Sequence, residues 1–267
     1  MVIEKALQFQ GKKLSYRIVG DGPTVALLHG VPFDGNLWEG QAGKLSGFKL
    51  IIPDLPGSGS SEMIDDMSME GMAEVIKGIL DVESSKVGTC ILIGHSMGGY
   101  ISLAFAEKYP SYLRGLGLFH STAYPDSEDR KAMRKKAIET IKSNGAPAFL
   151  RTAIPNLFSP QSKEKMRGTI DQFIESTNNF SPLSLVSYYE AMMQRPDRTS
   201  VLKTIKIPML FVAGKYDHAA PLNDLLKLCH LPEISYFHIL DEAGHMGMIE
   251  ETEKSKTILN DYLINVS

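Results

Sequence analysis

The chain has 267 residues, of which 43% are hydrophobic and 22% are charged, a composition that supports a full hydrophobic core and suits one α/β domain carrying an insertion. Its 28 Lys and Arg residues nearly balance its 31 Asp and Glu residues, so a net charge of −3 provides no basic footprint for nucleic acid or an anionic membrane. These numbers favour a small, roughly neutral molecule as the partner.

Two cysteines and the N-terminal segment bear on the cellular setting. Cys90 lies in an apolar run, Cys229 follows a helical stretch, and neither has neighbours at metal-ligand spacing, so we expect two buried, reduced thiols and no metal. The N-terminal residues lack the apolar core of a signal peptide, and no apolar run is long enough to span a membrane. A cytoplasmic location is therefore expected, while the oligomeric state stays open.

Short β-rich runs alternate with helical patterns over residues 1 to about 122, which is typical of a mostly parallel sheet covered on both faces. In chain order we expect a hairpin from residues 6–10 and 14–19, strands 25–29 and 50–53, a helix over 68–80, strand 90–94, a helix over 97–108 and strand 113–120. This stretch therefore supplies most of the expected strands.

The strand signal disappears between Tyr124 and Arg198, where helical spacing occurs in residues 130–143, 163–175 and 183–194. The alternation resumes with strand 209–213, helix 222–228, strand 235–240 and a final helix over 249–263. The sequence therefore predicts an α/β core of residues 1–123 and 199–267, with residues 124–198 inserted as a helical layer.

The motif Gly94-His95-Ser96-Met97-Gly98 matches G-x-S-x-G, with an apolar strand before it and a helix after it. A serine on such a sharp turn sits in strained backbone geometry, and glycines two positions away remove collisions with neighbouring backbone. The turn also places Ser96 at a helix N-terminus, where free N–H groups can receive a developing oxyanion. We therefore predict Ser96 as a nucleophile and the backbone N–H of Met97 as the first oxyanion donor.

A serine nucleophile needs an imidazole to take its proton, and His245 is the predicted base. This residue lies in a short loop between strand 235–240 and the last helix, at the strand end where sites form. By contrast, His238 is interpreted as structural within that strand, and His95 is expected to point away from the serine. His29 is interpreted as a hydrogen-bonding tie between loops.

Two aspartates compete for the carboxylate that orients the base. Asp217 follows strand 209–213 in a loop at the same sheet edge as His245, whereas Asp126 follows the strand that ends near His120. The placement rule for triad members favours Asp217, and Asp126 remains the rival.

The second oxyanion donor is expected in the loop that follows strand 25–29. The backbone N–H of Val31 is the candidate, because Gly30 allows close approach to the nucleophile and Pro32 has no N–H to donate.

Five blocks give the chain a resemblance to the α/β-hydrolase superfamily, in its esterase-like branch, over almost its whole length. They are His29-Gly30-Val31-Pro32, DLPGSGSS from Asp54 to Ser61, Gly94 to Gly99, Gly214 to Asp217, and Gly244-His245. The resemblance implies about eight strands, a Ser96–Asp217–His245 triad, a helical cap near residues 124–198, and no metal or organic cofactor. Dehalogenases and epoxide hydrolases use aspartate where this chain has Ser96, and the HGGPG and GGSWG motifs of proline iminopeptidases are absent.

The predicted chemistry is hydrolysis of a carboxylic ester or related acyl bond in a small to medium, partly apolar substrate, through an acyl-enzyme. The same triad also serves carbon–carbon bond hydrolases, thioesterases, lactonases and cofactor-free haloperoxidases, and the fold serves slow-turnover small-molecule receptors. Aromatic and Met side chains in the insertion are candidates for pocket walls, although helical spacing favours core packing for most of them: Phe149, Phe158, Phe173, Phe180, Tyr188, Tyr189, Met192 and Met193.

Overall fold

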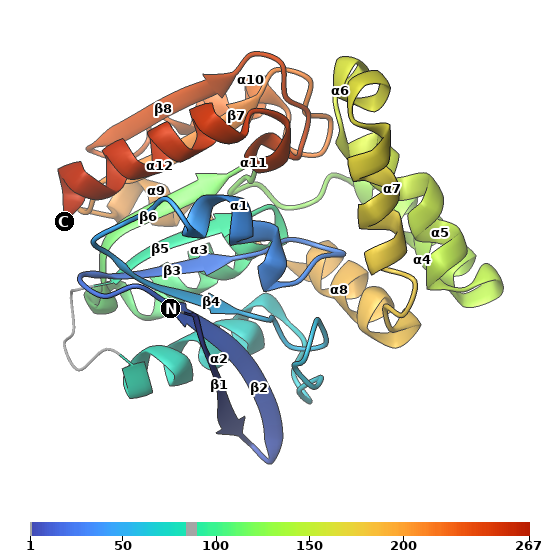
Figure 1. The fold of residues 1–267 in the computed structure, drawn as a ribbon, viewed down its shortest axis with the longest axis horizontal. Helices are drawn as coiled ribbons and strands as arrows, with labels where there is room; N and C mark the ends of the chain where they lie inside the picture. The colour runs from blue at the N-terminus through green and yellow to red at the C-terminus, as the bar shows by residue number, and fades with distance from the viewer. Residues whose placement is uncertain (1, 84–89) are drawn as a thin grey trace.

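The computed structural model describes residues 2–83 and 90–267, which contain an eight-stranded sheet in the order β1-β2-β4-β3-β5-β6-β7-β8 (Figure 1). Only the β1–β2 and β2–β4 pairs are antiparallel. The strands are β1 (Val2–Phe9), β2 (Lys12–Val19), β3 (Thr24–Leu28), β4 (Lys49–Pro53), β5 (Cys90–His95), β6 (Leu113–Phe119), β7 (Met209–Gly214) and β8 (Ser235–Leu240). The predicted mostly parallel sheet is confirmed.

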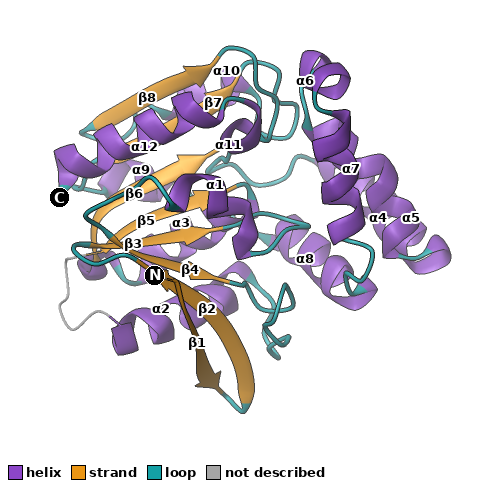
Figure 2. Ribbon diagram, viewed as in Figure 1, coloured by secondary structure: helices purple, strands orange, loops and turns teal. Residues whose placement is uncertain are grey.

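Helices cover both faces of this sheet (Figure 2). One face is covered by α2 (Met69–Glu83), α3 (Met97–Lys108), α9 (Thr199–Thr204) and α10 (Leu222–Leu228). The other face is covered by the short turn η1 (Gly35–Trp38), α1 (Glu39–Ala42), α11 (Gly247–Glu250) and α12 (Thr252–Val266). A further single turn, η2 (Pro110–Tyr112), connects α3 to β6.

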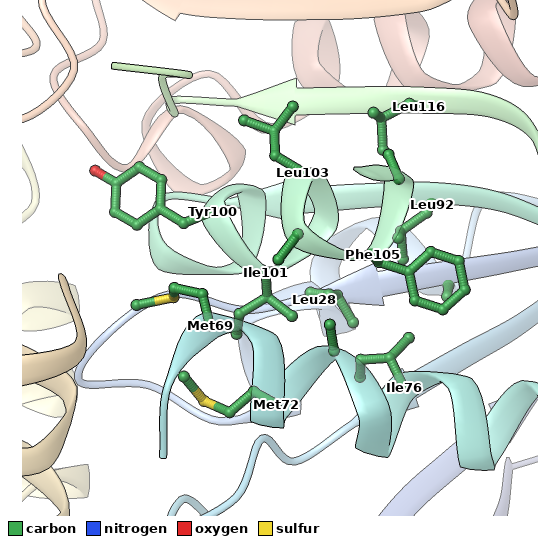
Figure 3. Close-up of a cluster of buried hydrophobic side chains, with 14 of the residues drawn as sticks. Leu28, Met69, Met72, Ile76, Leu92, Tyr100, Ile101, Leu103, Phe105 and Leu116 are labelled. Atoms are coloured by element: carbon green, nitrogen blue, oxygen red, sulfur yellow. The ribbon is translucent and has the colours of Figure 1, made fainter. Parts of the chain in front are cut away.

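Successive side chains of β3 pack alternately on the two faces of the sheet. Ala26 and Leu28 pack in the cluster shared with α2 and α3, whereas Val25 and Leu27 pack in the cluster shared with α12. Successive side chains of a strand point to opposite faces, so a strand covered on both sides must be apolar throughout. Figure 3 shows the first cluster, where Leu28 lies among side chains of α2 and α3.

Residues 120–198, which follow β6, form a helical segment, and Figure 1 shows its helices together at the end of the sheet to which the parallel strands point. It contains α4 (Glu128–Asn144), α5 (Ala146–Ala153), η3 (Ile154–Leu157), α6 (Pro160–Lys165), α7 (Arg167–Ser176) and α8 (Pro182–Gln194). All residues of this segment are described, and none lies in a strand. The carboxyl edge of the sheet is where α/β proteins bind ligands.

Several expected element bounds were wrong. The opening hairpin turns at Gln10-Gly11, so Lys12 and Lys13 already belong to β2. The helix expected over 163–175 is two helices, because Met166 leaves the helical conformation, and the final helix divides in the same way at Glu251. The helix α5 was not expected, because an N-G-A-P stretch reads as a loop.

The expectation of two buried thiols holds for one cysteine only. Both are free, but Cys90 is buried in β5 whereas Cys229, which follows α10, is only partly buried. Burial raises the pKa of the Cys90 thiol to about 12, so this group stays protonated. Among the helices of residues 2–83 and 90–267, none combines the length and apolarity needed to cross a bilayer.

Candidate active site

Ser96 stands at the junction of β5 and α3 in a strained conformation, with φ of 52° and ψ of −117°. Glycines make this turn possible. A Cβ on Gly94 would lie 2.2 Å from the carbonyl oxygen of Gly98, and a Cβ on Gly98 would lie 2.6 Å from that of Leu28. The collisions expected from the motif are therefore present in the structure, and Ser96 is presented at the carboxyl edge of the sheet.

Three predicted side chains, from loops far apart in sequence, form one hydrogen-bonded chain. The His245 Nε2 atom lies 2.8 Å from Ser96 Oγ, and His245 Nδ1 lies 2.8 Å from Asp217 Oδ2. Because Nδ1 donates to a carboxylate, it carries the proton, and Nε2 is left as an acceptor facing the serine hydroxyl. The arrangement can take a proton from Ser96 in one step.

The loop that carries His245 is held at several points. The His245 N–H donates to Leu157 O in η3 at 2.6 Å, and Glu250 Oε1 accepts from the N–H groups of Gly244 and Met246. The second oxygen of Glu250 accepts from the N–H of Ser159 at 2.8 Å. This carboxylate therefore fixes the loop and joins it to the helical segment after β6.

Asp217 is 4% exposed and accepts four hydrogen bonds. Its Oδ1 atom accepts from the backbone N–H groups of Ala219 and Ala220 at 2.7 and 2.9 Å, while Oδ2 accepts from His245 and also from His120 Nδ1 at 2.9 Å. Burial opposes the negative charge, but the charge and hydrogen bonds of the two histidines outweigh it and hold the pKa of this carboxyl far below its usual value. Asp217 is therefore an ionised acceptor.

His120 was not singled out from the sequence. It ends the β6 run with a φ of 51°, and its ring is buried, with no partner for Nε2 among the described residues. A Cβ on Gly247 would lie 2.3 Å from that nitrogen, which shows how tightly the ring is enclosed. The signal that could have found His120 is its position after a parallel strand, the same rule that selected Asp217.

The side chains of His120, Asp217 and His245 offer ligand atoms that lie within 4.8 Å of one another. Such a spacing is compatible with a metal ion. However, both imidazole Nδ1 atoms already donate protons to one carboxylate oxygen, so hydrogen bonds explain why these three side chains lie together.

The rival carboxylate, Asp126, lies in a different network. It is buried, its Oδ1 accepts from Arg195 Nη1 at 2.8 Å, and its Oδ2 accepts from Arg134 Nε at 2.5 Å. Burial again opposes the charge, but the two guanidinium groups lower the pKa of Asp126 below its usual value. No contact to His245 is present among these bonds, so the geometry favours Asp217 as the partner of the base.

Two further histidines occupy the places expected for them. His29 donates from Nδ1 to Gly30 O and accepts at Nε2 from the N–H of Leu55, so it ties two loops together. His95 points away from Ser96, and its Nε2 donates to the backbone oxygen of His245 at 2.9 Å. Burial, together with the neighbouring His245 and His120, holds the pKa of His95 well below its usual value, so His95 is a neutral brace.

The two expected oxyanion donors lie beside the serine. Met97 is the first residue of α3, where an N–H has no partner within the helix. Val31 lines the same cavity as Ser96, and a Cβ on the preceding Gly30 would lie only 2.8 Å from Ser96 Cβ. The loop therefore approaches the serine as closely as the sequence predicted.

A cavity of about 160 Å³ contains Ser96 and His245 in its wall. The helical segment after β6 supplies many of its walls, including Tyr189 and Met192 of α8. A larger cavity of about 760 Å³ shares Pro32 with it but includes neither Ser96 nor His245, and it has Phe173 and Phe180 in its wall. Four of the eight candidate side chains therefore line cavities. The remaining four pack in or against the apolar clusters: Phe149, Phe158, Tyr188 and Met193.

Comparison with known proteins agrees with this geometry. Residues 23–137 match the family model for the alpha/beta hydrolase fold. A thermophilic esterase from Thermogutta terrifontis, solved with malate bound, superposes with a TM-score of 0.90 and 28% identity over 100% of this chain and 99% of its own. The chain has the α/β-hydrolase fold.

The names of similar proteins cover several different reactions. A 3-oxoadipate enol-lactonase from Acinetobacter baylyi is 24% identical over 96% of this chain and 95% of its own. A 2-hydroxy-6-oxononadienedioate/2-hydroxy-6-oxononatrienedioate hydrolase from Paraburkholderia phymatum is 27% identical over 94% of this chain and 91% of its own. Identities this low do not assign a substrate, so the substrate must be argued from the site.

Proposed function

We propose that this α/β-hydrolase is a serine hydrolase that cleaves a carboxylic ester, or a related acyl bond, of a small and partly apolar substrate. The observation that carries the proposal is the pair of 2.8 Å contacts that joins Ser96 Oγ to His245 and His245 to Asp217. A serine hydroxyl is a poor nucleophile until a base accepts its proton, and these contacts supply the base and its orienting carboxylate. The esterase and lactonase names of similar proteins support the same reaction class.

Acylation follows from the orientation of the three groups. Ser96 Oγ attacks the substrate carbonyl carbon while its proton passes to His245 Nε2, and Asp217 stabilises the imidazolium that forms. The carbonyl oxygen becomes an oxyanion, which accepts from the backbone N–H groups of Val31 and Met97. His245 then gives the proton to the leaving alcohol as the carbon–oxygen bond breaks, and the acyl group stays on Ser96.

Deacylation repeats these steps with water as the nucleophile. His245 takes a proton from the water as its oxygen attacks the acyl carbon, and Ser96 Oγ leaves with that proton. The free acid departs and the resting arrangement returns. These steps use only the described side chains and the two amides, and a reaction without a cofactor stays a prediction.

Helices α4 to α8 form the cap of the site in this proposal. Residues 124–198 would then be the specificity-determining insertion, with residues 1–123 and 199–267 as the catalytic core. The support is that α4, α5, η3 and α8 all contribute to the wall of the cavity that contains Ser96. A small-molecule substrate follows from that enclosure, and the cytoplasmic location stays a prediction.

Labelling with a fluorophosphonate tests the nucleophile directly, because the probe forms a covalent adduct only with an activated serine. We expect mass spectrometry to find one adduct on Ser96 in the parent protein and none in Ser96→Ala. Turnover of a short p-nitrophenyl ester should disappear in the same variant while its thermal unfolding stays unchanged. Ester hydrolysis that persists in Ser96→Ala would refute the assignment.

A substrate panel separates the rival activities that share the triad. Esters, thioesters, lactones and a vinylogous 1,5-diketone are compared at equal concentration, with Ser96→Ala as the background. The highest kcat/KM on esters supports the proposal, and the highest value on the diketone would instead assign a carbon–carbon bond hydrolase. Tight binding with negligible turnover of every member would assign a receptor.

A further inference from the structure

The walls of the 160 Å³ cavity have an unusual charge distribution. Arg130 and Arg134, one helical turn apart on α4, both line the cavity together with Ser96, and no Asp or Glu is among the described residues that line it. Its other polar wall groups are hydroxyls and the imidazole of His245. Two cations therefore face a small space that otherwise holds aliphatic and aromatic side chains.

Neither arginine is fully balanced by an anion. Arg130 donates to the backbone oxygens of His218 and Ala219, and no carboxylate of the described residues pairs with it. Arg134 donates from Nε to Asp126, but Asp126 is shared with Arg195, and no acceptor for the Nη atoms of Arg134 is present among the described residues. Arg134 and Arg195 thus share the single carboxylate of Asp126, and Arg130 forms no ion pair among the described residues.

These charges persist at neutral pH because arginine does not release its proton in proteins. Burial alone would lower the pKa of Arg134, but its hydrogen bond with Asp126 holds that pKa above its usual value. The side chain of Arg134 is 17% exposed, so little water is available to solvate the charge. A planar guanidinium in such a place has the geometry to receive a carboxylate through two parallel hydrogen bonds.

The larger cavity next to this site has the opposite character. Its wall includes the carboxylates of Asp34 and Glu39 and no basic side chain among the described residues. An anionic group would therefore be attracted to the smaller cavity and repelled from the larger one. The two cavities distinguish the two ends of an asymmetric substrate by charge.

We propose that the cavity beside Ser96 recognises a short acyl group that ends in a carboxylate, with Arg130 and Arg134 as its binding residues. The volume of about 160 Å³ equals the space of about five water molecules, which suits an acyl group of roughly five carbon atoms. The inference rests on the proposed serine hydrolase function and specifies its substrate class. The neutral alcohol part would then lie toward the larger cavity.

Three methyl esters of similar length test the charge preference. Monomethyl glutarate carries a terminal carboxylate, methyl pentanoate is neutral, and methyl 4-aminobutanoate carries a terminal ammonium. Because a hydrogen bond to a charged group contributes about 1.5–3 kcal/mol, we expect kcat/KM for the anionic ester to exceed that for the neutral ester by roughly 10- to 100-fold. The cationic ester should be the poorest of the three.

Charge-removing variants assign the preference to these side chains. Arg134→Gln and Arg130→Gln should each lower the ratio of anionic to neutral kcat/KM by about tenfold. Asp126 keeps Arg195 as a partner in Arg134→Gln, so the variant does not strand a buried carboxylate. Lys135→Gln is the matched control, since it removes one charge from an exposed position of the same helix and should leave the ratio unchanged.

Binding to Ser96→Ala gives a readout that does not depend on turnover. Calorimetry should show monomethyl glutarate binding at least tenfold more tightly than methyl pentanoate, and Arg134→Gln in the same background should remove the difference. Equal or weaker binding of the anionic ester would overturn the inference about the carboxylate. If Ser96 is still labelled in that case, the proposed serine hydrolase function stands. Absence of labelling and of any turnover would overturn the proposed function, and the calorimetric comparison would still decide the charge preference.

Discussion

Replacing Asp217 with asparagine is expected to remove most of the activity without unfolding the protein. In the structure Oδ1 faces two backbone N–H groups and Oδ2 faces two imidazole N–H groups. An amide has one oxygen and one NH2 group, so whichever way it is oriented its NH2 meets two donors. The backbone donors are fixed, whereas His245 and His120 can move their protons from Nδ1 to Nε2. The amide oxygen will therefore face the backbone.

That change of tautomer has a direct catalytic consequence. His245 Nε2 would carry a proton and would no longer accept one from Ser96, which lies 2.8 Å away. Loss of the correct tautomer in a serine triad costs about 10⁴-fold in kcat, which corresponds to about 5 kcal/mol of barrier. We expect Asp217→Asn to show this loss on a neutral p-nitrophenyl ester in a stopped or continuous absorbance assay.

Asp126→Asn is the matched comparison, because it makes the same chemical change at the rival carboxylate. This substitution weakens a buried pair of contacts to Arg134 and Arg195, so it should cost about 3 kcal/mol of unfolding free energy and lower Tm by roughly 6–12 °C. Its kcat should stay within tenfold of the parent value. The reasoning fails if Asp126→Asn loses 10⁴-fold in kcat while Asp217→Asn keeps its activity.

Three further outcomes follow from individual contacts. Gly98→Ala should cost about 1–3 kcal/mol in urea unfolding, since its Cβ would lie 2.6 Å from Leu28 O, and unchanged stability would contradict that clash. His120→Leu removes one donor from Asp217 and so strengthens the bond of Asp217 to His245. The acidic limb of the pH profile of kcat/KM should then move to higher pH by as much as about one unit. His120→Asn keeps a donor at this position and should show the parent pH profile. Glu83 is bound by Lys5, Tyr16 and Lys49, and although burial opposes its charge, these contacts lower its pKa to about 2. The ionised Glu83 contributes at most about 3 kcal/mol to the free energy of unfolding, fully above the unfolded pKa of about 4.3, and this contribution is lost as pH falls toward 2. In Glu83→Gln the free energy of unfolding should therefore depend less on pH between these two values.

The strands and the residues at their ends were predictable because they follow short-range rules. A continuous apolar run such as residues 90–94 can only be a buried strand or helix, and the glycines around Ser96 mark the turn that follows it. The positions of Asp217 and His245 followed from one further rule, that parallel strands end at the same edge of a sheet. The structure brings those three side chains together as that rule requires.

Partners that depend on long-range packing could not be predicted. His120 reaches Asp217 across 97 positions, and although its position after a parallel strand places it at the right sheet edge, nothing in its local sequence pairs it with Asp217. The same holds for Glu250, which fixes the loop of His245 through three backbone N–H groups that no pattern pairs with it. The break in the helical run at Met166 lies two residues before Gly168, but a single glycine inside a helical pattern is tolerated and so did not predict a break there.

The net charge of a protein does not give the charge of an individual site, for a physical reason. A value of −3 averages the whole surface and led to the expectation of a roughly neutral partner. Coulomb interactions in a partly buried cavity depend instead on the few charges within several ångströms, where the dielectric screening is weaker than in water. Arg130 and Arg134 repeat at i and i+4 on α4, which in sequence alone reads as the solvated face of a basic helix. Only the fold shows that this face of α4 lies toward Ser96. The ratio of kcat/KM between monomethyl glutarate and methyl pentanoate therefore measures the charge inside the cavity rather than the net charge of the protein.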